Sequence, residues 1–235
     1  MKTFSIKLIL CLIGGVLFTS CSASRRQFIR EADYSAPIRV ACVGNSITYG
    51  YGIADREHNS YPAQLAALLG PKWEVRNFGV NGATALKKGT RPYQDQLSYR
   101  DALAFKPDVV VIKLGTNDTN PKSWPAHKND FPEDYLDIIH NFQALETKPR
   151  IYVCRPVPLF RDRGKEYDTD KILTEEVIPQ INAIAAKKYL PVIDLYTPFA
   201  GKAALFRDGV HPDSTGARIM AEVIYTKLSG RSVTR

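Results

Sequence analysis

Apolar residues occur along the chain in short runs that alternate with longer amphipathic segments. Five runs have the length and composition of strands: 37–43, 73–78, 107–114, 150–154 and 191–195. The third run (PDVVVIKL) is almost continuously apolar, which is typical of a strand buried on both faces of a parallel sheet. We therefore expect these runs to form one central sheet.

The segments between these runs have apolar residues at helical spacing. They are residues 61–69, 93–105, 133–145, 171–189 and 213–228. Pro179 forces a kink or a fresh start in the fourth segment, and Asp213 is placed to cap the last one. Alternation of strands and helices predicts an α/β protein with three layers, in which helices cover both faces of a parallel sheet of about five strands.

The composition fits a soluble globular domain and excludes several other classes. The chain has 235 residues, of which 44% are hydrophobic and 24% are charged. These proportions exclude a disordered tail, a collagen-like fibre and a disulfide-dense mini-protein. Because no Gly/Ser-rich or Pro-rich spacer divides the sequence, we expect one domain, over residues 37–230.

The first residues are typical of a secretory signal. Lys2 and Lys7 precede the apolar run 8–18, which is shorter than the roughly 20 residues of a membrane-spanning helix. Small residues then precede Cys21, as at a bacterial lipoprotein processing site. We expect a signal peptide over 1–20, lipidation of Cys21, a tether over 21–36 and an exported, membrane-anchored protein at the periplasm or cell surface. Ordinary cleavage with an unmodified Cys21 is the alternative.

Charge and cysteine usage indicate neither nucleic acid binding nor a metal site. Loss of the two lysines in residues 1–20 lowers the formal net charge from +8 to +6. The basic residues are scattered, so a solvated surface is favoured over a nucleic acid interface. Cys42 and Cys154 lie in predicted strands and are expected to be buried thiols. Neither metal-ligand spacing nor a phosphate-binding loop is found, so we expect no cofactor.

Four polar clusters follow predicted strands or precede the last helix, where an open α/β sheet binds its ligands. They are Gly44-Asn45-Ser46-Ile47-Thr48, 77–82 (NFGVNG), Gly115-Thr116-Asn117-Asp118 and 208–212 (DGVHP). Each cluster alone is also compatible with a turn or a helix cap. Their occurrence together, each at its own position along the sheet, favours a catalytic site.

Three of these residues have the chemistry of a serine hydrolase. A Ser hydroxyl needs a base within hydrogen-bond reach, and His211 is the candidate base for Ser46. Asp208 lies three residues before His211, so that one turn can hold both side chains and the carboxylate can accept the imidazole N–H. We take Ser46, Asp208 and His211 as the candidate catalytic residues.

In these clusters the sequence resembles the SGNH (GDSL-type) hydrolases, a family of serine esterases with a flavodoxin-like fold, from about residue 39 to 227. The resemblance implies an oxyanion hole formed by the backbone N–H groups of Ser46 and Gly82 and the side-chain amide of Asn117. The family usually has Gly-Asp-Ser in its first block, whereas this chain has Gly44-Asn45-Ser46. That departure affects local hydrogen bonding rather than the nucleophile.

The sequence indicates the substrate less specifically than it indicates the catalytic residues. The segments 120–134 and 160–171 are polar or charged and do not form an apolar lid, which favours a short acyl group. The chain also resembles exported bacterial carbohydrate O-acetylesterases, so we expect an O-acetyl ester on a small molecule or polysaccharide. A lysophospholipase or thioesterase, and a non-catalytic carbohydrate-binding lipoprotein, are the alternatives. Candidate substrate contacts are Asn45, Trp124 and His127.

Overall fold

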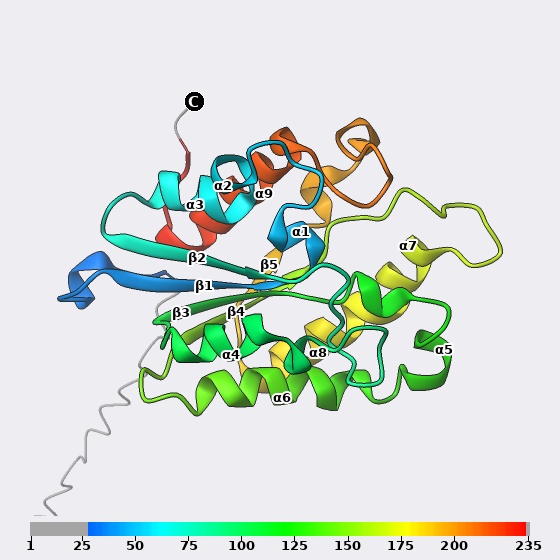
Figure 1. Cartoon of the computed structure of the whole chain (residues 1–235), viewed down its shortest axis with the longest axis horizontal. Helices are drawn as coiled ribbons and strands as arrows, with labels where there is room; N and C mark the ends of the chain where they lie inside the picture. The colour runs from blue at the N-terminus through cyan, green and yellow to red at the C-terminus, as the bar shows by residue number, and fades with distance from the viewer. Residues whose placement is uncertain (1–27, 234–235) are drawn as a thin grey trace, which may run out of the picture.

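A central sheet of five parallel strands organises the computed structural model, which describes residues 28–233 (Figure 1). The strands follow the order β2-β1-β3-β4-β5. Their bounds are β1 Ile38–Gly44, β2 Trp73–Gly79, β3 Val109–Lys113, β4 Arg150–Arg155 and β5 Val192–Asp194. The predicted strands and the predicted α/β class are confirmed. The signal segment, Cys21 and its lipidation lie outside the described residues and stay predictions.

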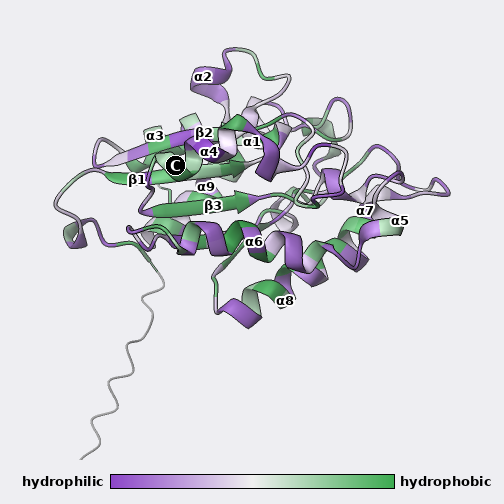
Figure 2. Ribbon diagram, turned by 60° about the horizontal axis from the view of Figure 1, so that its bottom comes forward, coloured by the Kyte–Doolittle hydropathy of each residue, from purple (hydrophilic) through white to green (hydrophobic). Residues whose placement is uncertain are grey.

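Helices cover both faces of this sheet. On one side lie α3 (Tyr61–Leu69) and α9 (Ser214–Ser229), and on the other α4 (Leu97–Ala104), α6 (Phe131–Gln143) and α8 (Ile178–Lys188) (Figure 1). The central strands β1 and β3 are apolar along most of their length, whereas helices alternate between apolar and polar residues (Figure 2). Each face of the sheet therefore buries its own apolar layer, as parallel sheets require.

Proline and short turns divide two segments that the pattern predicted as single helices. Residues 171–189 are split into α7 (Thr169–Ile172), a π-helical stretch (Leu173–Val177) and α8, whose first turn holds Pro179. Residues 93–105 are split into a 3₁₀ turn (Tyr93–Asp95) and α4. Asp213 caps α9 as predicted, its carboxylate accepting the Gly216 N–H at 2.9 Å.

Several elements are too short for a helical period to reveal them. These are the helices α1 (Ser46–Tyr49), α2 (Arg56–Asn59) and α5 (Trp124–His127), together with 3₁₀ turns at Glu31–Asp33, Asn117–Thr119, Thr197–Phe199 and Ala203–Leu205. Most of them follow the carboxyl ends of strands, where the polar clusters lie. The polar clusters therefore lie among short elements that a periodic pattern of apolar residues cannot predict.

The amino-terminal part of the described chain packs against the domain. Residues 28–36 belong to the segment expected to be a tether, but Ile29 is buried and its N–H donates to the Leu228 carbonyl at 2.7 Å. Glu31 accepts a hydrogen bond from the Trp73 indole. Part of the predicted tether therefore contacts the domain, and the bounds 21–36 and 37–230 stay a prediction. Among the helices of residues 28–233, none is both long and apolar enough to cross a membrane.

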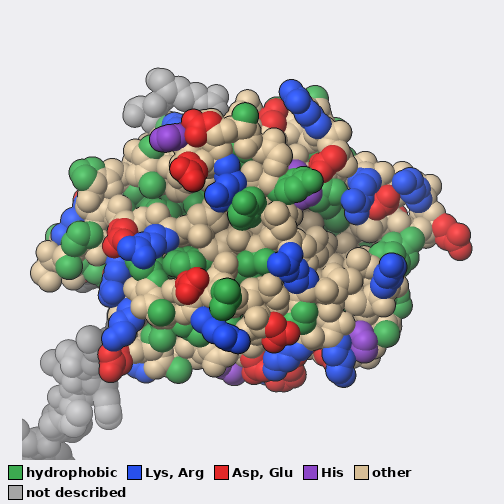
Figure 3. Space-filling model, viewed as in Figure 1, with side chains coloured by type: hydrophobic (Ala, Val, Ile, Leu, Met, Phe, Trp, Pro, Cys, Tyr) green, Lys and Arg blue, Asp and Glu red, His purple; other side chains and the backbone are tan. Residues whose placement is uncertain are grey.

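Charged side chains are spread over the surface rather than gathered by sign. Basic and acidic residues are interspersed on the face drawn in Figure 3. Many are paired, as in Lys88–Asp130 at 3.1 Å and Arg218–Glu222 at 2.9 Å. This distribution matches the solvated surface that the scattered sequence positions predicted.

Candidate active site

The strand order places one crevice at the centre of the carboxyl edge. β1 lies between β2 and β3, so the connections after β1 and β3 diverge to opposite faces of the sheet. Such a switch point is where open α/β sheets bind ligands. Ser46 follows β1 and Asn117 follows β3, and both therefore enter this crevice from neighbouring strands.

A tight turn at the end of β1 presents Ser46. The Asn45 side chain accepts the Ile47 N–H at 3.1 Å and so caps helix α1, which starts at Ser46. The first N–H groups of a helix have no partner within it, so that of Ser46 is available to a ligand. Gly44 is required in this turn, because a Cβ there would lie 2.7 Å from the Lys113 carbonyl oxygen.

The three predicted catalytic side chains are brought into one hydrogen-bonded chain. The Ser46 hydroxyl lies 2.7 Å from His211 Nε2. On the other side of the ring, His211 Nδ1 lies 2.6 Å from Asp208 Oδ2. With Nδ1 donating to the carboxylate, Nε2 is left as the acceptor for the hydroxyl proton.

Asp208 is held as a carboxylate by its own turn. Partial burial favours the neutral acid, but hydrogen bonds from the ring and backbone of His211 and the backbone of Val210 outweigh it and lower the pKa of Asp208 to about 2. The second oxygen, Oδ1, accepts the N–H groups of Val210 at 2.9 Å and His211 at 2.8 Å. The carboxylate thus stays charged and aimed at the imidazole at any pH above that value.

The residues expected to form the oxyanion hole lie in turns that are hydrogen-bonded to one another. Gly82 has φ +75°, a conformation that favours glycine, and its N–H donates to no acceptor among the described residues. The side-chain amide of Asn117 donates to the Ala83 carbonyl at 2.9 Å, which puts it beside the Gly82 turn and leaves its second N–H free to donate elsewhere. The Val80 N–H donates to the Gly44 carbonyl at 3.0 Å and ties this turn to the end of β1.

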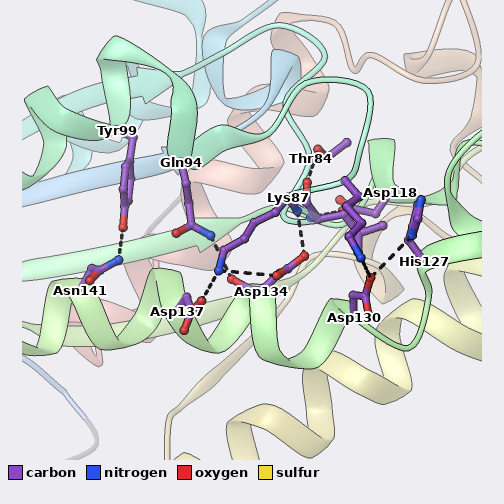
Figure 4. Close-up of polar contacts among 12 residues, drawn as sticks. Thr84, Lys87, Gln94, Tyr99, Asp118, His127, Asp130, Asp134, Asp137 and Asn141 are labelled. Carbon is purple, nitrogen blue, oxygen red and sulfur yellow. Dashed lines mark hydrogen bonds and ion pairs between the residues drawn. The ribbon is translucent and has the colours of Figure 1, made fainter.

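Two buried carboxylates anchor the loop that follows Gly82 (Figure 4). Asp118 accepts the N–H groups of Ala85 at 3.2 Å and Leu86 at 2.8 Å. Burial raises the pKa of Asp118 to about 6, although these backbone hydrogen bonds oppose the rise. Further along, Asp134 on α6 accepts the Lys87 N–H at 2.8 Å. The loop is thereby fixed to the elements after β3, which holds Gly82 in place.

A lysine lies in the core directly beneath the nucleophile turn. Lys113, the last residue of β3, is 0% exposed, and its ammonium nitrogen lies 2.9 Å from Thr116 Oγ1 and 3.3 Å from Asn45 Oδ1. Burial lowers the pKa of Lys113 to about 7, and the nearby Cys154 thiol opposes this only weakly. Cys42 and Cys154 are buried free thiols, as predicted.

Two hollows flank the catalytic side chains. One, of about 470 Å³, is lined by Asn117, Val210 and the charged residues Arg161, Asp162, Lys165 and Glu166. The other, of about 390 Å³, has His211 itself in its lining, together with Tyr51, Asn59, Arg207, Asp208 and Ser214. Both volumes lie in the range of ligand pockets, roughly 300–1,000 Å³. Neither is an apolar tunnel.

The three candidate substrate contacts lie elsewhere. Trp124 is 1% exposed and packs edge-on against Phe131, so it is a core residue. His127, three residues further on, faces Asp130 across 3.6 Å (Figure 4). Asn45 is fully buried and caps α1. None of the three lines either hollow, and their role as substrate contacts stays a prediction.

Three residues of the site region were missed by sequence reasoning. Lys113 had a signal, since it is the single charge within an apolar strand. Asp118 ends the Gly-Thr-Asn-Asp cluster, but nothing in the sequence indicates that it anchors the loop after Gly82. Tyr51 had no signal beyond its position five residues after Ser46, and it lines the second hollow.

Comparison with known proteins identifies the family to which this chain belongs. Residues 42–219 match the GDSL-like lipase/acylhydrolase family model. An acetylxylan esterase of Xylanibacter ruminicola is 40% identical over 80% of this chain, which spans only 42% of that protein's length. An acetylxylan esterase of Geobacillus stearothermophilus is 24% identical over 76% of this chain and 83% of its own length.

Solved structures show the same fold. A putative lipolytic protein of the G-D-S-L family from Desulfitobacterium hafniense superposes with a TM-score of 0.63 at 24% identity, over 81% of this chain and 99% of its own. At that identity the likeness concerns the fold alone. The family match covers all four polar clusters, from the end of β1 to the start of α9. The chain therefore belongs to the GDSL-like lipase/acylhydrolase family.

Proposed function

We propose that this protein is a serine esterase that removes short acyl groups, O-acetyl above all, from carbohydrate. The observation that carries the proposal is the continuous hydrogen-bonded chain from Ser46 through His211 to Asp208, with distances of 2.7 Å and 2.6 Å. The acetylxylan esterases among its relatives support the substrate class, and the 40% identity of one of them is the stronger support.

In the proposed reaction the Ser46 oxygen attacks the acyl carbonyl carbon while His211 Nε2 takes the hydroxyl proton. A bond forms between the Ser46 oxygen and this carbon, and the carbonyl π electrons move onto the carbonyl oxygen. Asp208 keeps Nδ1–H in place and stabilises the imidazolium without taking its proton. The tetrahedral intermediate then collapses, its bond to the sugar oxygen breaks, and His211 returns the proton to that oxygen as the alcohol leaves.

The oxyanion requires donors fixed before the reaction begins, because reorganising them during the reaction would raise the barrier. The N–H groups of Ser46 and Gly82 and the Asn117 amide are such donors. They are fixed by the α1 turn, the anchored loop and the end of β3. Water then attacks the acyl-enzyme with His211 as base, and acetate is released as Ser46 regains its proton.

The charged lining of the site supports a short acyl group. A chain of eight or more carbons gains about 0.8 kcal/mol per buried methylene only where it meets apolar surface. The hollow beside Asn117 presents the charged residues Arg161, Asp162 and Lys165 next to the apolar Leu159 and Val210. Burying an alkyl chain there would displace water from charged groups without replacing their hydrogen bonds. Acetyl esters are therefore expected to react faster than long acyl esters.

A panel of esters tests the proposal. Acetylated xylan, O-acetylated sialic acid, acetylated pectin, and p-nitrophenyl esters from acetyl to dodecanoyl are compared under one condition. We expect kcat/KM for acetyl to exceed that for octanoyl by at least about tenfold, which corresponds to about 1.4 kcal/mol. A preference for octanoyl or longer chains would replace this function by that of a lysophospholipase or thioesterase. Absence of turnover on every ester would leave a binding protein.

A further inference from the structure

An aromatic ring lies exposed against the imidazole of the catalytic histidine. Tyr51 is 51% exposed, and its ring centroid lies 4.7 Å from that of His211 with the two planes tilted by 47°. The ring lies on the side of His211 that faces the hollow of about 390 Å³. An aromatic face open to solvent beside the reacting groups is a surface on which an apolar part of a ligand can bind.

The backbone holds this ring in a defined position. Helix α1 ends at Tyr49, and Gly50 follows with φ +87°. This left-handed conformation lets the N–H of Tyr51 donate to the Ser46 carbonyl at 2.9 Å. The hydrogen bond ties Tyr51 to the same residue that carries the nucleophile. The main chain of Tyr51 is thus held next to Ser46 by one turn of the chain, and its ring contacts His211 from there.

The polar groups around the ring suit a sugar. Asn59, Arg207 and Ser214 share the hollow with Tyr51. A pyranose has an apolar face of C–H groups and a rim of hydroxyls, so it matches an aromatic face that is surrounded by polar side chains. The departing alcohol must also lie close to His211, because this residue returns the proton to it. The hollow has His211 in its lining, so it lies next to the residue that returns this proton.

We propose that Tyr51 and the hollow it borders form the subsite for the sugar ring whose ester is cleaved, with the pyranose face stacked on the Tyr51 ring. This subsite rests on the proposed function, since it presumes that the alcohol is a carbohydrate. The polar neighbours Asn59 and Arg207 bind the hydroxyl groups of the sugar. The subsite contributes to binding of the alcohol and takes no part in bond making.

Replacing Tyr51 tests the subsite against two acetyl esters that differ in the alcohol. For Tyr51→Ala we expect kcat/KM on acetylated xylo-oligosaccharide to fall roughly tenfold or more, chiefly through KM, because the stacking face is lost. On ethyl acetate, whose alcohol is too small to stack, the change should stay within about threefold. Tyr51→Phe keeps the face and should behave as the wild type, and Tyr51→Leu keeps bulk without the aromatic face and should resemble Tyr51→Ala.

The control is Tyr189→Ala, at a tyrosine that is 79% exposed at the opposite edge of the sheet. Equal losses on both substrates would show that Tyr51 merely supports His211 and would overturn the subsite. So would an unchanged kcat/KM on the oligosaccharide. A wild-type enzyme without activity on the oligosaccharide would instead contradict the proposed function itself, so the two failures are distinguishable.

A second, independent observation concerns the buried Lys113. Its ammonium nitrogen contacts Asn45, which caps the helix that begins at Ser46, and Thr116, which directly precedes Asn117. The Thr116 carbonyl in turn accepts the Thr119 hydroxyl at 2.8 Å. One buried amine therefore joins the turn of the nucleophile to the turn of the oxyanion amide. A fully buried position without a carboxylate partner is unfavourable for an amine, so packing alone does not explain a lysine there.

We propose that Lys113 is a positioning residue that holds the Ser46 and Asn117 turns at a fixed separation. Displacement of a catalytic group by about 1 Å can lower the rate about 10²-fold. For Lys113→Met, similar in length but without donors, we expect kcat to fall roughly 10–100-fold with KM within about threefold. The melting temperature should stay equal or rise, because an apolar side chain suits the site better. Lys113→Gln, which retains an N–H donor, should recover part of the rate.

The pH dependence of stability is a second readout of Lys113→Met. The unfolded chain holds this proton up to a pH of about 10.4, whereas the folded protein releases it near pH 7. Between these values the unfolded state binds more protons, so stability should rise with pH in the wild type. The rise should be smaller in Lys113→Met, and Lys202→Met, at an exposed lysine, is the matched control.

Two outcomes would overturn the positioning role. Wild-type kcat in Lys113→Met would show that the link is not needed, and a loss of rate that parallels a fall in melting temperature would show that the lysine serves the core. If that variant does not fold, Thr116→Val removes the acceptor at the other end of the link and leaves Lys113 in place. It should lower kcat in the same direction, by less, and an unchanged kcat would equally overturn the proposal.

Discussion

Replacement of Ser46 by alanine is expected to lower kcat on acetyl esters by roughly 10³–10⁶-fold. The hydroxyl is the only group in the hydrogen-bonded chain that can form the acyl-enzyme, and His211 then has no proton to take. The Asp208 turn and the oxyanion donors remain, so a residual rate above that of water should persist. The fold should be unaffected, because the side chain that is removed ends in a single hydroxyl at the edge of the sheet.

The measurement combines turnover with active-site labelling. A fluorophosphonate probe should modify the wild type at Ser46, as located by peptide mass spectrometry, and should not modify Ser46→Ala. Ser35→Ala, at an exposed serine before β1, is the matched control and should keep both activity and labelling. Activity of Ser46→Ala within about tenfold of the wild type, or labelling at another residue, would assign the nucleophile elsewhere.

Of the variants proposed here, replacement of Gly79 by alanine is expected to cause the largest loss of stability. A Cβ at Gly79 would lie 2.1 Å from the Tyr49 nitrogen and 2.7 Å from the Thr48 carbonyl carbon. Both atoms belong to the backbone of α1 and cannot turn away as a side chain would. The nucleophile turn and β2 must then separate, so we expect a fall of about 3 kcal/mol in the free energy of unfolding. The displaced turn should also lower kcat.

The variant Gly52→Ala is the control, because it introduces backbone strain without a steric clash. Gly52 has φ +77°, but no heavy atom lies within 4 Å of its added Cβ, so only conformational strain of about 1 kcal/mol is expected. Denaturant unfolding of the two variants, with kcat measured in parallel, gives the comparison. Equal losses of stability would show that the contact between β2 and α1 yields easily and that the close approach at Gly79 is not a constraint.

The structure shows what Asn45 contacts at the position where the family usually has aspartate. Asn45 caps α1 through one side-chain oxygen, and the same oxygen is approached by Lys113 at 3.3 Å. An aspartate there would place a carboxylate beside the buried ammonium group, whereas the amide leaves Lys113 with neutral partners only among the described residues. The local change therefore bears on the charge state of a buried lysine as well as on one hydrogen bond.

The sequence by itself determined the sheet, its helices and the identity of the catalytic groups. Strand 107–114 was recognisable because burial on both faces leaves an almost unbroken apolar run. Helix α3 was predicted at its observed bounds because its apolar residues have helical spacing and Gly70 ends it. Ser46, Asp208 and His211 were recognisable because each lies in a polar cluster beside a strand or helix end. These signals are local, since they depend on residues within one turn or one strand.

Only the tertiary structure decided which of these groups meet and what surrounds them. Ser46 and His211 are 165 residues apart, and the fold brings the loop between β5 and α9 to the end of β1, where the two side chains lie 2.7 Å apart. Side-chain direction in short loops was also undetermined, and so Trp124 proved buried whereas Tyr51 proved exposed against His211. The reason is physical: periodicity reports burial along regular elements, but contacts across the carboxyl edge depend on how separate turns are packed together.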